Sequence, residues 1–225
     1  MAKVAHYAYP EILYRFRSIN PDNWEREMRC IKRGEIYCGK FSNLNDPMEG
    51  VHRESALFRK SKNYDGSMSK IRREMESIGV ASLSECRNSE TMWAHYAGQF
   101  SGILISYRFK RLVRSTPSEC KIVRMVYNEV PPVFLRDNMP LDQRARLALS
   151  TKTLKWADER EWRLLAPEIG SIKYEDEKTV KDIVIGARFD RKRFLGELKE
   201  ICLDLEIKLL EMKVGGYQLE YSEVL

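Results

Sequence analysis

The sequence predicts an α+β fold with a mixed or antiparallel sheet and flanking helices. Strand-like and helix-like segments alternate irregularly, several strand-like segments have only one apolar face, and no glycine-rich turn follows the first strand. The first two features favour a mixed or antiparallel sheet over a doubly wound parallel one. The third argues against a Rossmann or P-loop nucleotide site. We expect a single domain over residues 1–225, with its core motifs in residues 11–189.

The first strand and helix are predicted by their periodicities. In "EILYRFRS", residues 11–18, a period of two places Tyr14 and Phe16 on one face and Arg15 and Arg17 on the other. The stretch "NPDNWEREMRCIKRG" predicts a helix that is capped at its start by Asn20 or Asp22. Its apolar face has Trp24, Met28 and Ile31, and Gly34 ends it in the left-handed conformation.

The remaining elements follow the same signals, with turns at clusters of Gly, Pro, Asn and Asp. Further strands are expected at residues 35–39, 80–84, 102–109, 121–127, 182–189, 208–214 and 217–224, and further helices at 67–79, 89–98, 141–155 and 191–205. Residues 41–50 form an ordered polar loop. Gly215 and Gly216 predict a hairpin turn between the last two strands.

Composition places the chain among soluble globular proteins. It is 43% hydrophobic and 32% charged, with a net charge of +6 spread along its length. That charge suits a nucleotide or a polyanionic partner only weakly. The five cysteines form no C-x-x-C pair, which argues against a disulfide framework and a thiolate zinc site. With no signal-like or membrane-spanning apolar run, we expect a cytoplasmic protein without a membrane partner.

The stretch "NDPMEGVHRE" is the strongest candidate for metal binding. It places Asp46, Glu49, His52 and Glu54 within nine positions, and such groups could hold a divalent ion for phosphodiester cleavage. Turn chemistry explains Asn-Asp-Pro equally well, and no second ligand cluster of recognised spacing exists. We expect no metal, and keep a metal-dependent nuclease as an alternative.

The stretch "WADEREWRLL", residues 156–165, predicts a strand with an unusual charged face. A period of two puts Glu159, Glu161 and Arg163 on one face and Trp162 on the other. One interpretation is a ladder of cross-strand ion pairs on a surface strand. The other is a site that stabilises a positively charged sugar in a transition state.

Several stretches together resemble the bacterial family known as domain of unknown function 2971. They occur in the family's order over most of the chain from residue 11 to residue 189. They are "LYRFRSIN" at 13–20, "EIYCGKFSNLNDPMEG" at 35–50, "SLSE" at 82–85, "MWAHYAGQFSGILISY" at 92–107, "TLKWADEREWRLL" at 153–165 and "DIVIGARF" at 182–189.

The chain is also distantly similar to the ADP-ribosyltransferase-like fold, through its opening strand, helix, "G-x-I-Y" and Ser/Asn loop. The resemblance implies that Arg15, with Arg17 on the same face, contacts NAD. "EREWRL" supplies the fold's late Glu-x-Glu motif as Glu159 and Glu161. A second motif, a Ser, Thr or Tyr on a middle element, is matched by either Ser84 or Tyr96. The Ser-Thr-Ser form of the arginine-modifying toxins is absent, which leaves the second motif and the modified residue type open.

The resemblance also implies a role for each residue. Glu161 hydrogen-bonds the ribose hydroxyls as oxocarbenium character develops, and Glu159 orients or deprotonates the acceptor. Arg15 and Arg17 hold the pyrophosphate. The nicotinamide is expected to stack on an aromatic side chain, Tyr96 or Trp93. Arg163 is expected to pair with a glutamate rather than touch the substrate.

The function implied by the resemblance is ADP-ribosyl transfer from NAD to a macromolecule, in a bacterial toxin or phage-defence setting. The basic charge favours a nucleic-acid acceptor over a protein. Nothing in the sequence shows an antitoxin partner or a homo-oligomer. The alternatives are a non-catalytic nucleotide or nucleic-acid binding module, the metal-dependent nuclease, and a purely structural interaction protein, which would be favoured if Arg15 and Glu161 were far apart.

Overall fold

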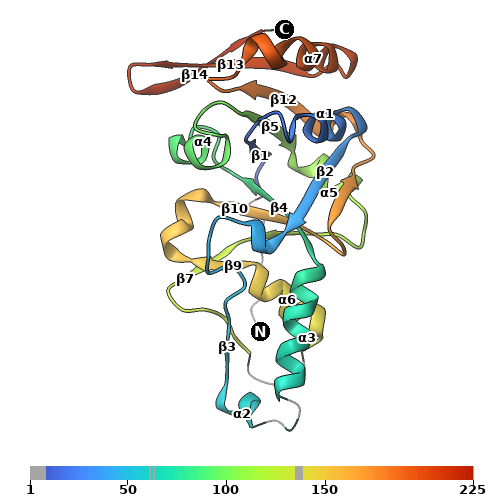
Figure 1. The fold of residues 1–225 in the computed structure, drawn as a ribbon, viewed down its shortest axis with the longest axis vertical. Coiled ribbons are helices and arrows are strands. Elements are labelled where there is room, and N and C mark those ends of the chain that lie inside the picture. Colours follow the sequence, from blue (N-terminus) through green and yellow to red (C-terminus); the bar gives the residue numbers. More distant parts are fainter. Residues whose placement is uncertain (1–8, 61, 63, 135–138, 225) are drawn as a thin grey trace, which may run out of the picture. The chain divides into compact units, whose positions relative to one another are not determined.

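The computed structural model describes residues 9–60, 62, 64–134 and 139–224, and contains two compact units (Figure 1). Each unit is assembled from separate parts of the chain. The first unit takes its residues from 1–34, 85–116 and 174–225, and the second takes 35–84 and 117–173. The expectation of one domain over residues 1–225 stays a prediction.

The first unit is built on a mixed sheet. Its strands, in spatial order, are β1 (Ile12–Arg17), β5 (Ile103–Arg108), β12 (Val180–Ile185), β13 (Lys208–Gly215) and β14 (Gln218–Glu223). The β12–β13 pair is parallel and the other neighbouring pairs are antiparallel. This arrangement confirms the predicted mixed sheet and the predicted hairpin between the last two strands.

The predicted N-cap of the first helix is wrong: Asn23, rather than Asn20 or Asp22, precedes the helix, and its side chain makes no capping bond. The helices of the first unit otherwise lie close to where the sequence signals predict. They are α1 (Trp24–Arg33), α4 (Glu90–Tyr96), α5 (Phe109–Ser115), the short 3₁₀ helix η3 (Glu177–Thr179) and α7 (Arg191–Asp204). Gly34 ends α1 with φ +65°, and its N–H bonds back to the helix. The Ser89 hydroxyl caps α4 by accepting from the backbone N–H of Met92. Helix α5 was not predicted.

Alternation along β1 gives the strand two different faces. Phe16 packs edge-on against Trp93 of α4, with ring centroids 5.4 Å apart. Arg17 lies on the opposite face and pairs with Glu27 of α1. The predicted separation of the aromatic and basic faces of this strand is therefore confirmed.

The second unit is built on an antiparallel sheet. Its strands, in spatial order, are β11 (Gly170–Lys173), β2 (Glu35–Lys40), β4 (Gly79–Ser84), β10 (Glu161–Ala166) and β6 (Lys121–Arg124). Two short parallel pairs accompany it: β3 (Arg53–Glu54) with β8 (Val133–Phe134), and β7 (Val126–Asn128) with β9 (Thr151–Thr153). Register places Glu161 opposite Ser84 and Arg163 opposite Ser82.

Two helices of the second unit, α3 and α6, lie side by side (Figure 1). The helices of this unit are η1 (Phe41–Asn43), α2 (Ala56–Arg59), α3 (Tyr64–Ser77), α6 (Leu141–Leu149) and η2 (Leu154–Glu159). Buried Ile71 and Met75 of α3 pack with Ala145 and Leu149 of α6 in one apolar cluster. This cluster, with Leu165 of β10, is the core of the unit.

The predicted helix over 141–155 is wrong in its second half. Helix α6 ends at Leu149, and the chain continues as β9 and η2. The hydroxyls of Ser150 and Thr151 both donate to the carbonyl of Leu147, so side chains compete for a helix acceptor. The change of element turns Lys152 back towards the sheet.

The predicted strand over 156–165 is also too long. Strand β10 begins at Glu161, while Glu159 ends the 3₁₀ helix η2 and Arg160 has φ +44°. Glu159 and Glu161 therefore do not share one strand face. A left-handed residue between them brings them together instead.

Two other boundaries differ from expectation. Gly79 does not end a helix: α3 ends at Ser77 and Gly79 begins β4. A Cβ at Gly79 would lie 2.3 Å from the carbonyl oxygen of Glu168, so close backbone approach requires glycine there. The strand expected at 121–127 is split between β6 and β7 at Met125.

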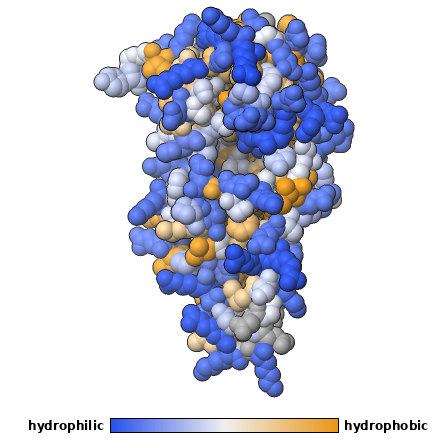
Figure 2. Space-filling model, viewed as in Figure 1, coloured by the Kyte–Doolittle hydropathy of each residue, from blue (hydrophilic) through white to orange (hydrophobic). Residues whose placement is uncertain are grey.

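Hydrophilic residues cover most of the face shown in Figure 2, and apolar side chains occur there in small separate patches. No helix in the described part of the chain is long and apolar enough to cross a membrane.

Candidate functional site

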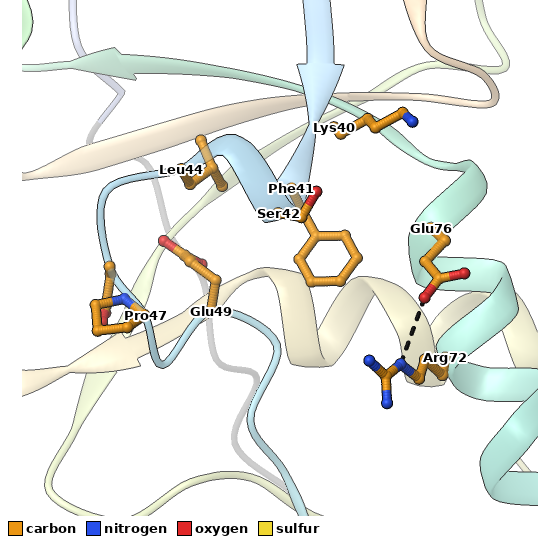
Figure 3. Close-up of a pocket in the computed structure, with 9 residues that line it drawn as sticks. Lys40, Phe41, Ser42, Leu44, Pro47, Glu49, Arg72 and Glu76 are labelled. Carbon is orange, nitrogen blue, oxygen red and sulfur yellow. Dashed lines mark hydrogen bonds and ion pairs between the residues drawn. The ribbon is translucent and has the colours of Figure 1, made fainter.

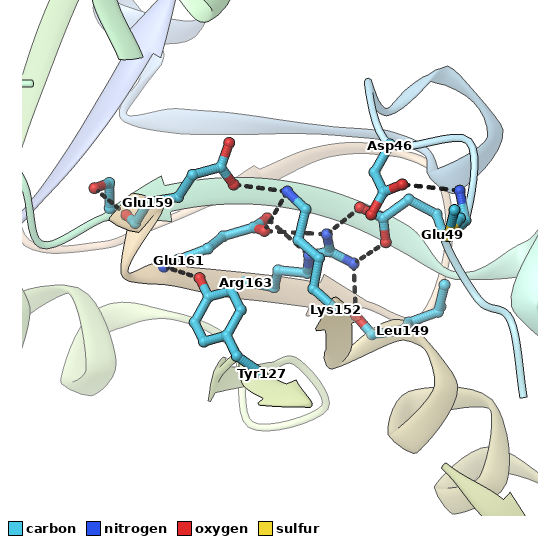
Figure 4. Close-up of polar contacts among 10 residues, drawn as sticks. Asp46, Glu49, Tyr127, Leu149, Lys152, Glu159, Glu161 and Arg163 are labelled. Carbon is cyan, nitrogen blue, oxygen red and sulfur yellow. Dashed lines mark hydrogen bonds and ion pairs between the residues drawn. The ribbon is translucent and has the colours of Figure 1, made fainter. Parts of the chain in front are cut away.

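The charged stretch at the start of β10 lies inside a buried ion-pair cluster of the second unit (Figure 4). Arg163 is 1% exposed. Its Nε lies 2.8 Å from Oε1 of Glu161, and its two terminal nitrogens lie 2.8 and 2.6 Å from the carboxylate oxygens of Glu49. It also donates to the carbonyl of Leu149. The expectation that Arg163 pairs with a glutamate is confirmed.

Lys152 joins the two glutamates of the Glu-x-Glu motif. Its Nζ lies 2.6 Å from Oε2 of Glu159 and 3.4 Å from Oε2 of Glu161. The same ammonium lies 4.3 Å from the ring centroid of Trp156, within cation–π range. We call Glu49, Lys152, Glu159, Glu161 and Arg163 the glutamate cluster.

Two side chains fix the backbone between η2 and β10. The Ser84 hydroxyl donates to the carbonyl of Glu159 at 2.6 Å, and the backbone N–H of Glu161 donates to the phenol oxygen of Tyr127 at 2.7 Å. These bonds hold the chain on both sides of Arg160. Ser84, predicted as a cofactor contact, is completely buried here and positions Glu159.

The glutamate cluster brings three carboxylates together with two cations. Burial alone would raise the pKa of Glu161, but the charge and hydrogen bonds of Arg163, with Lys152 and Ser82, lower it. Burial alone would lower the pKa of Arg163, and Glu161 and Glu49 raise it instead. Both groups therefore stay ionised while buried.

A pocket of about 460 Å³ adjoins the cluster in the second unit (Figure 3). Its lining comes from the end of β2, the loop after it and α3. The lining residues are Lys40, Phe41, Ser42, Leu44, Asp46, Pro47, Glu49, Arg72 and Glu76. Glu49 belongs to both the pocket and the glutamate cluster, because it lines the pocket and binds Arg163.

The predicted site residues are divided between the two units. Glu159, Glu161 and Ser84 belong to the second unit and meet within it. The predicted NAD contacts Arg15, Arg17, Trp93 and Tyr96 belong to the first unit.

Within the first unit, the predicted cofactor contacts lie on two faces of β1. Arg15 is 6% exposed, and Arg17 pairs with Glu27 on the α1 side. Trp93, on the α4 side, is completely buried against Phe16. Trp93 therefore presents no surface to a ligand in this structure.

Tyr96 is the more accessible of the two candidate stacking residues. It is half-buried and lies beside His95, with ring centroids 6.3 Å apart. Of the two aromatic residues predicted to stack on nicotinamide, only Tyr96 has exposed ring surface.

Residues of the candidate metal loop have separate partners. His52 contacts the carbonyl of Gly50 through Nδ1 and packs on Phe134, while Glu54 pairs with Arg59 at 3.7 Å. Among the described residues, no group of three or more His, Cys, Asp or Glu is placed to hold a metal ion. His6 lies outside the described residues.

Two residues of the glutamate cluster, and Tyr127 that supports it, were missed or misread from the sequence. Lys152 was assigned to a helix, Tyr127 to the end of a strand, and Glu49 to a metal loop. The Thr-Lys-Thr alternation after Leu149 was the one available signal, because β-branched residues around a lysine favour a strand.

Residues 92–164 match the family model described as protein of unknown function (DUF2971), which confirms the family resemblance of the sequence motifs. No curated protein and no solved structure matches the chain.

Proposed function

We propose that this chain, whose central part matches a family of unknown function, is an ADP-ribosyltransferase-like enzyme that uses NAD to modify a macromolecule. The observation that supports the proposal is the pair Glu159 and Glu161 around the ammonium of Lys152, in a buried cluster with Arg163. Carboxylates held in place in a buried site favour a reaction in which positive charge develops.

The proposed reaction breaks the bond between ribose C1′ and the nicotinamide nitrogen. The electron pair leaves with nicotinamide, and the ribose gains oxocarbenium character. Glu161 stabilises that charge through the ribose hydroxyls. The acceptor nucleophile then bonds to C1′ and its proton passes to Glu159. The side chain of Glu159 is the more exposed of the two, at 11% against 5%, which supports this division of roles.

The rest of the proposed complex follows the sequence resemblance. The roles that the resemblance gives to Arg15, Arg17 and Tyr96 stay predictions, because these residues belong to the first unit and come from two faces of β1. The net charge of +6 favours a nucleic-acid acceptor over a protein. The proposed setting is the bacterial cytoplasm, in a toxin or phage-defence role.

A binding module without turnover is a second candidate, favoured by one observation. Both oxygens of Glu161 are held by Arg163 and Lys152, and its side chain is only 5% exposed. A carboxylate held in this way stabilises the unit even if no substrate reacts. For the enzyme, Glu161→Gln should lower the rate of nicotinamide release far more than the affinity for NAD. For the binding module, ligand affinity should survive the same substitution.

The deciding experiment titrates NAD into the protein by calorimetry and follows nicotinamide release in the same sample. We expect Glu161→Gln to retain NAD binding and to lose release by about a hundredfold or more. Asp182→Asn is the matched control: Asp182 is a buried carboxylate of the first unit that accepts from Ser106 and pairs with Arg87.

The outcomes separate the candidates. Binding without release in the wild type would favour the binding module. Absence of NAD binding would contradict the enzyme and an NAD-binding module, and would leave only a module that binds nucleic acid. Equal loss of release in Glu161→Gln and Asp182→Asn would indicate a general effect of removing a buried carboxylate, and would contradict the role given to Glu161.

A further inference from the structure

The pocket of the second unit contains a buried carboxylate without a counter-charge. Asp46 is 5% exposed and lines the pocket. Its Oδ1 accepts the backbone N–H of Met48 at 2.9 Å, and it forms no ion pair within residues 9–60, 62, 64–134 and 139–224. Buried carboxylates are costly unless a cation accompanies them.

Glu49, on the same loop, differs from Asp46 because it has a cation as partner. Its side chain is also 5% exposed, but the guanidinium of Arg163 holds both of its oxygens. The loop thus carries two buried acids, of which one has its cation inside the protein. The second has an open pocket beside it.

The other charged groups of the pocket do not balance Asp46. Arg72 pairs with Glu76 at 3.4 Å, and both belong to α3. The ammonium of Lys40 points away from Glu49 and Pro47 (Figure 3). Near Glu49 the pocket wall is apolar, formed by Leu44, Pro47 and the ring of Phe41 (Figure 3).

We propose that this pocket binds an organic monocation, with Asp46 as its ion-pair partner and the ring of Phe41 against its body. A pocket lined by both an aromatic ring and a carboxylate suits a planar or alkyl cation. The volume of about 460 Å³ is many times the roughly 30 Å³ that a water occupies in the liquid, so the space fits a ring or a side chain rather than a bare ion.

Two groups carry this chemistry: the positively charged nicotinamide ring of NAD, which would then stack on Phe41 instead of Tyr96, and a guanidinium or amine, which would mean a protein acceptor in place of a nucleic acid. Treating the cation as substrate rests on the proposed function, whereas the cation preference of the pocket does not. Glu49 connects the pocket to Glu161 through Arg163, so the bound cation adjoins the glutamate cluster.

The test measures binding of small probes by calorimetry without NAD. The probes are 1-methylnicotinamide, a planar cation; agmatine, a guanidinium on an alkyl chain; neutral nicotinamide; and Mg²⁺. We expect one or both organic cations to bind, with neutral nicotinamide at least about tenfold weaker than its methylated cation if the ring is the guest. The comparison between probes on the wild type needs no variant.

Asp46→Asn supplies the second arm. Asparagine keeps an oxygen for the Met48 N–H and removes the charge, so we expect the ligand-free variant to unfold at the same temperature as the wild type or higher. Cation binding should fall by about tenfold or more. Asp182→Asn removes a buried carboxylate that has Arg87 as partner, and should leave cation binding unchanged.

Each result decides the proposal. Binding of 1-methylnicotinamide alone assigns the pocket to NAD, and binding of agmatine alone assigns it to the acceptor; both support a cation pocket. Failure of both cations, equal binding by Asp46→Asn, or Asp46-dependent binding of Mg²⁺ alone would overturn it. Because nicotinamide release is measured separately, failure of the NAD proposal leaves these results interpretable.

Discussion

Arg163 is the residue on which the candidate site depends. Its planar fork reaches Glu161 and both oxygens of Glu49 at once, and lysine offers only a point charge. Without it, two buried carboxylates would face each other with Lys152 as the remaining cation of the cluster. Ionisation of Glu161, which the proposed chemistry requires, is therefore maintained largely by Arg163.

We expect Arg163→Met to lower the free energy of unfolding by about 3–5 kcal/mol, because it leaves buried carboxylates without their partner. Urea unfolding measures this change. Arg111→Met is the control: the exposed Arg111–Asp176 pair, 2.7 Å long, should cost no more than about 1 kcal/mol. Similar losses in both variants would mean that the glutamate cluster contributes no more than a surface pair.

At the scale of single elements, the pairing of α1 with α7 shows how sequence-distant helices are joined. Trp24 of α1 stacks on Phe194 of α7 with ring centroids 4.5 Å apart, and its Nε1 donates to Glu197 at 2.6 Å. The apolar periodicity of both helices could be predicted from the sequence. That the two helices pack against each other could not.

Phe194→Ala should destabilise the protein by about 3–5 kcal/mol, because it removes a buried ring from this contact. Chemical denaturation followed by tryptophan fluorescence would report it. Leu203→Ala lies on the same helix with Leu203 62% exposed, and should change stability by less than about 0.5 kcal/mol. A loss in Phe194→Ala as small as in Leu203→Ala would contradict the packing described for α7.

Elements with a strong period and a clear end were predictable, and the turn that builds the site was not. Gly34 ends α1 as predicted, and the Ser89 hydroxyl caps α4 at the start of the predicted helix. Arg160 adopts a left-handed conformation that nothing in its residue type favours. The long-range bonds of Ser84 and Tyr127 hold it there. Glu159 thus reached Glu161 by tertiary contacts rather than by strand periodicity.

At the scale of the whole molecule, each unit contains a buried glutamate that is held ionised by arginine. Burial alone would raise the pKa of Glu27 and of Glu161, but Arg17 and Arg163 respectively lower it below the ordinary value of 4.5. A lowered folded-state pKa gives stability that is present above the unfolded-state value and is lost as the pH falls through the folded-state value. Both units are therefore expected to be sensitive to acid.

We expect the free energy of unfolding to decline as the pH is lowered below about 4.5, since both carboxylates must then take up protons on unfolding. Urea titrations across this range measure the slope. Glu27→Gln and Glu161→Gln should each flatten it, because each removes one of the protons taken up. An unchanged slope in both variants would contradict the pKa shifts assigned to these groups.

The interleaving of the two units along the chain has a consequence for synthesis. All segments of the second unit have been made by residue 173, whereas the first unit still lacks β12, β13, β14 and α7. Synthesis from the N-terminus therefore completes every residue of the glutamate cluster before β12 is made. At that stage β5, in the first unit, still lacks its partner strand on one side. Until residues 174–225 are made, the nascent protein has all the residues of its candidate site but only part of the first unit's sheet.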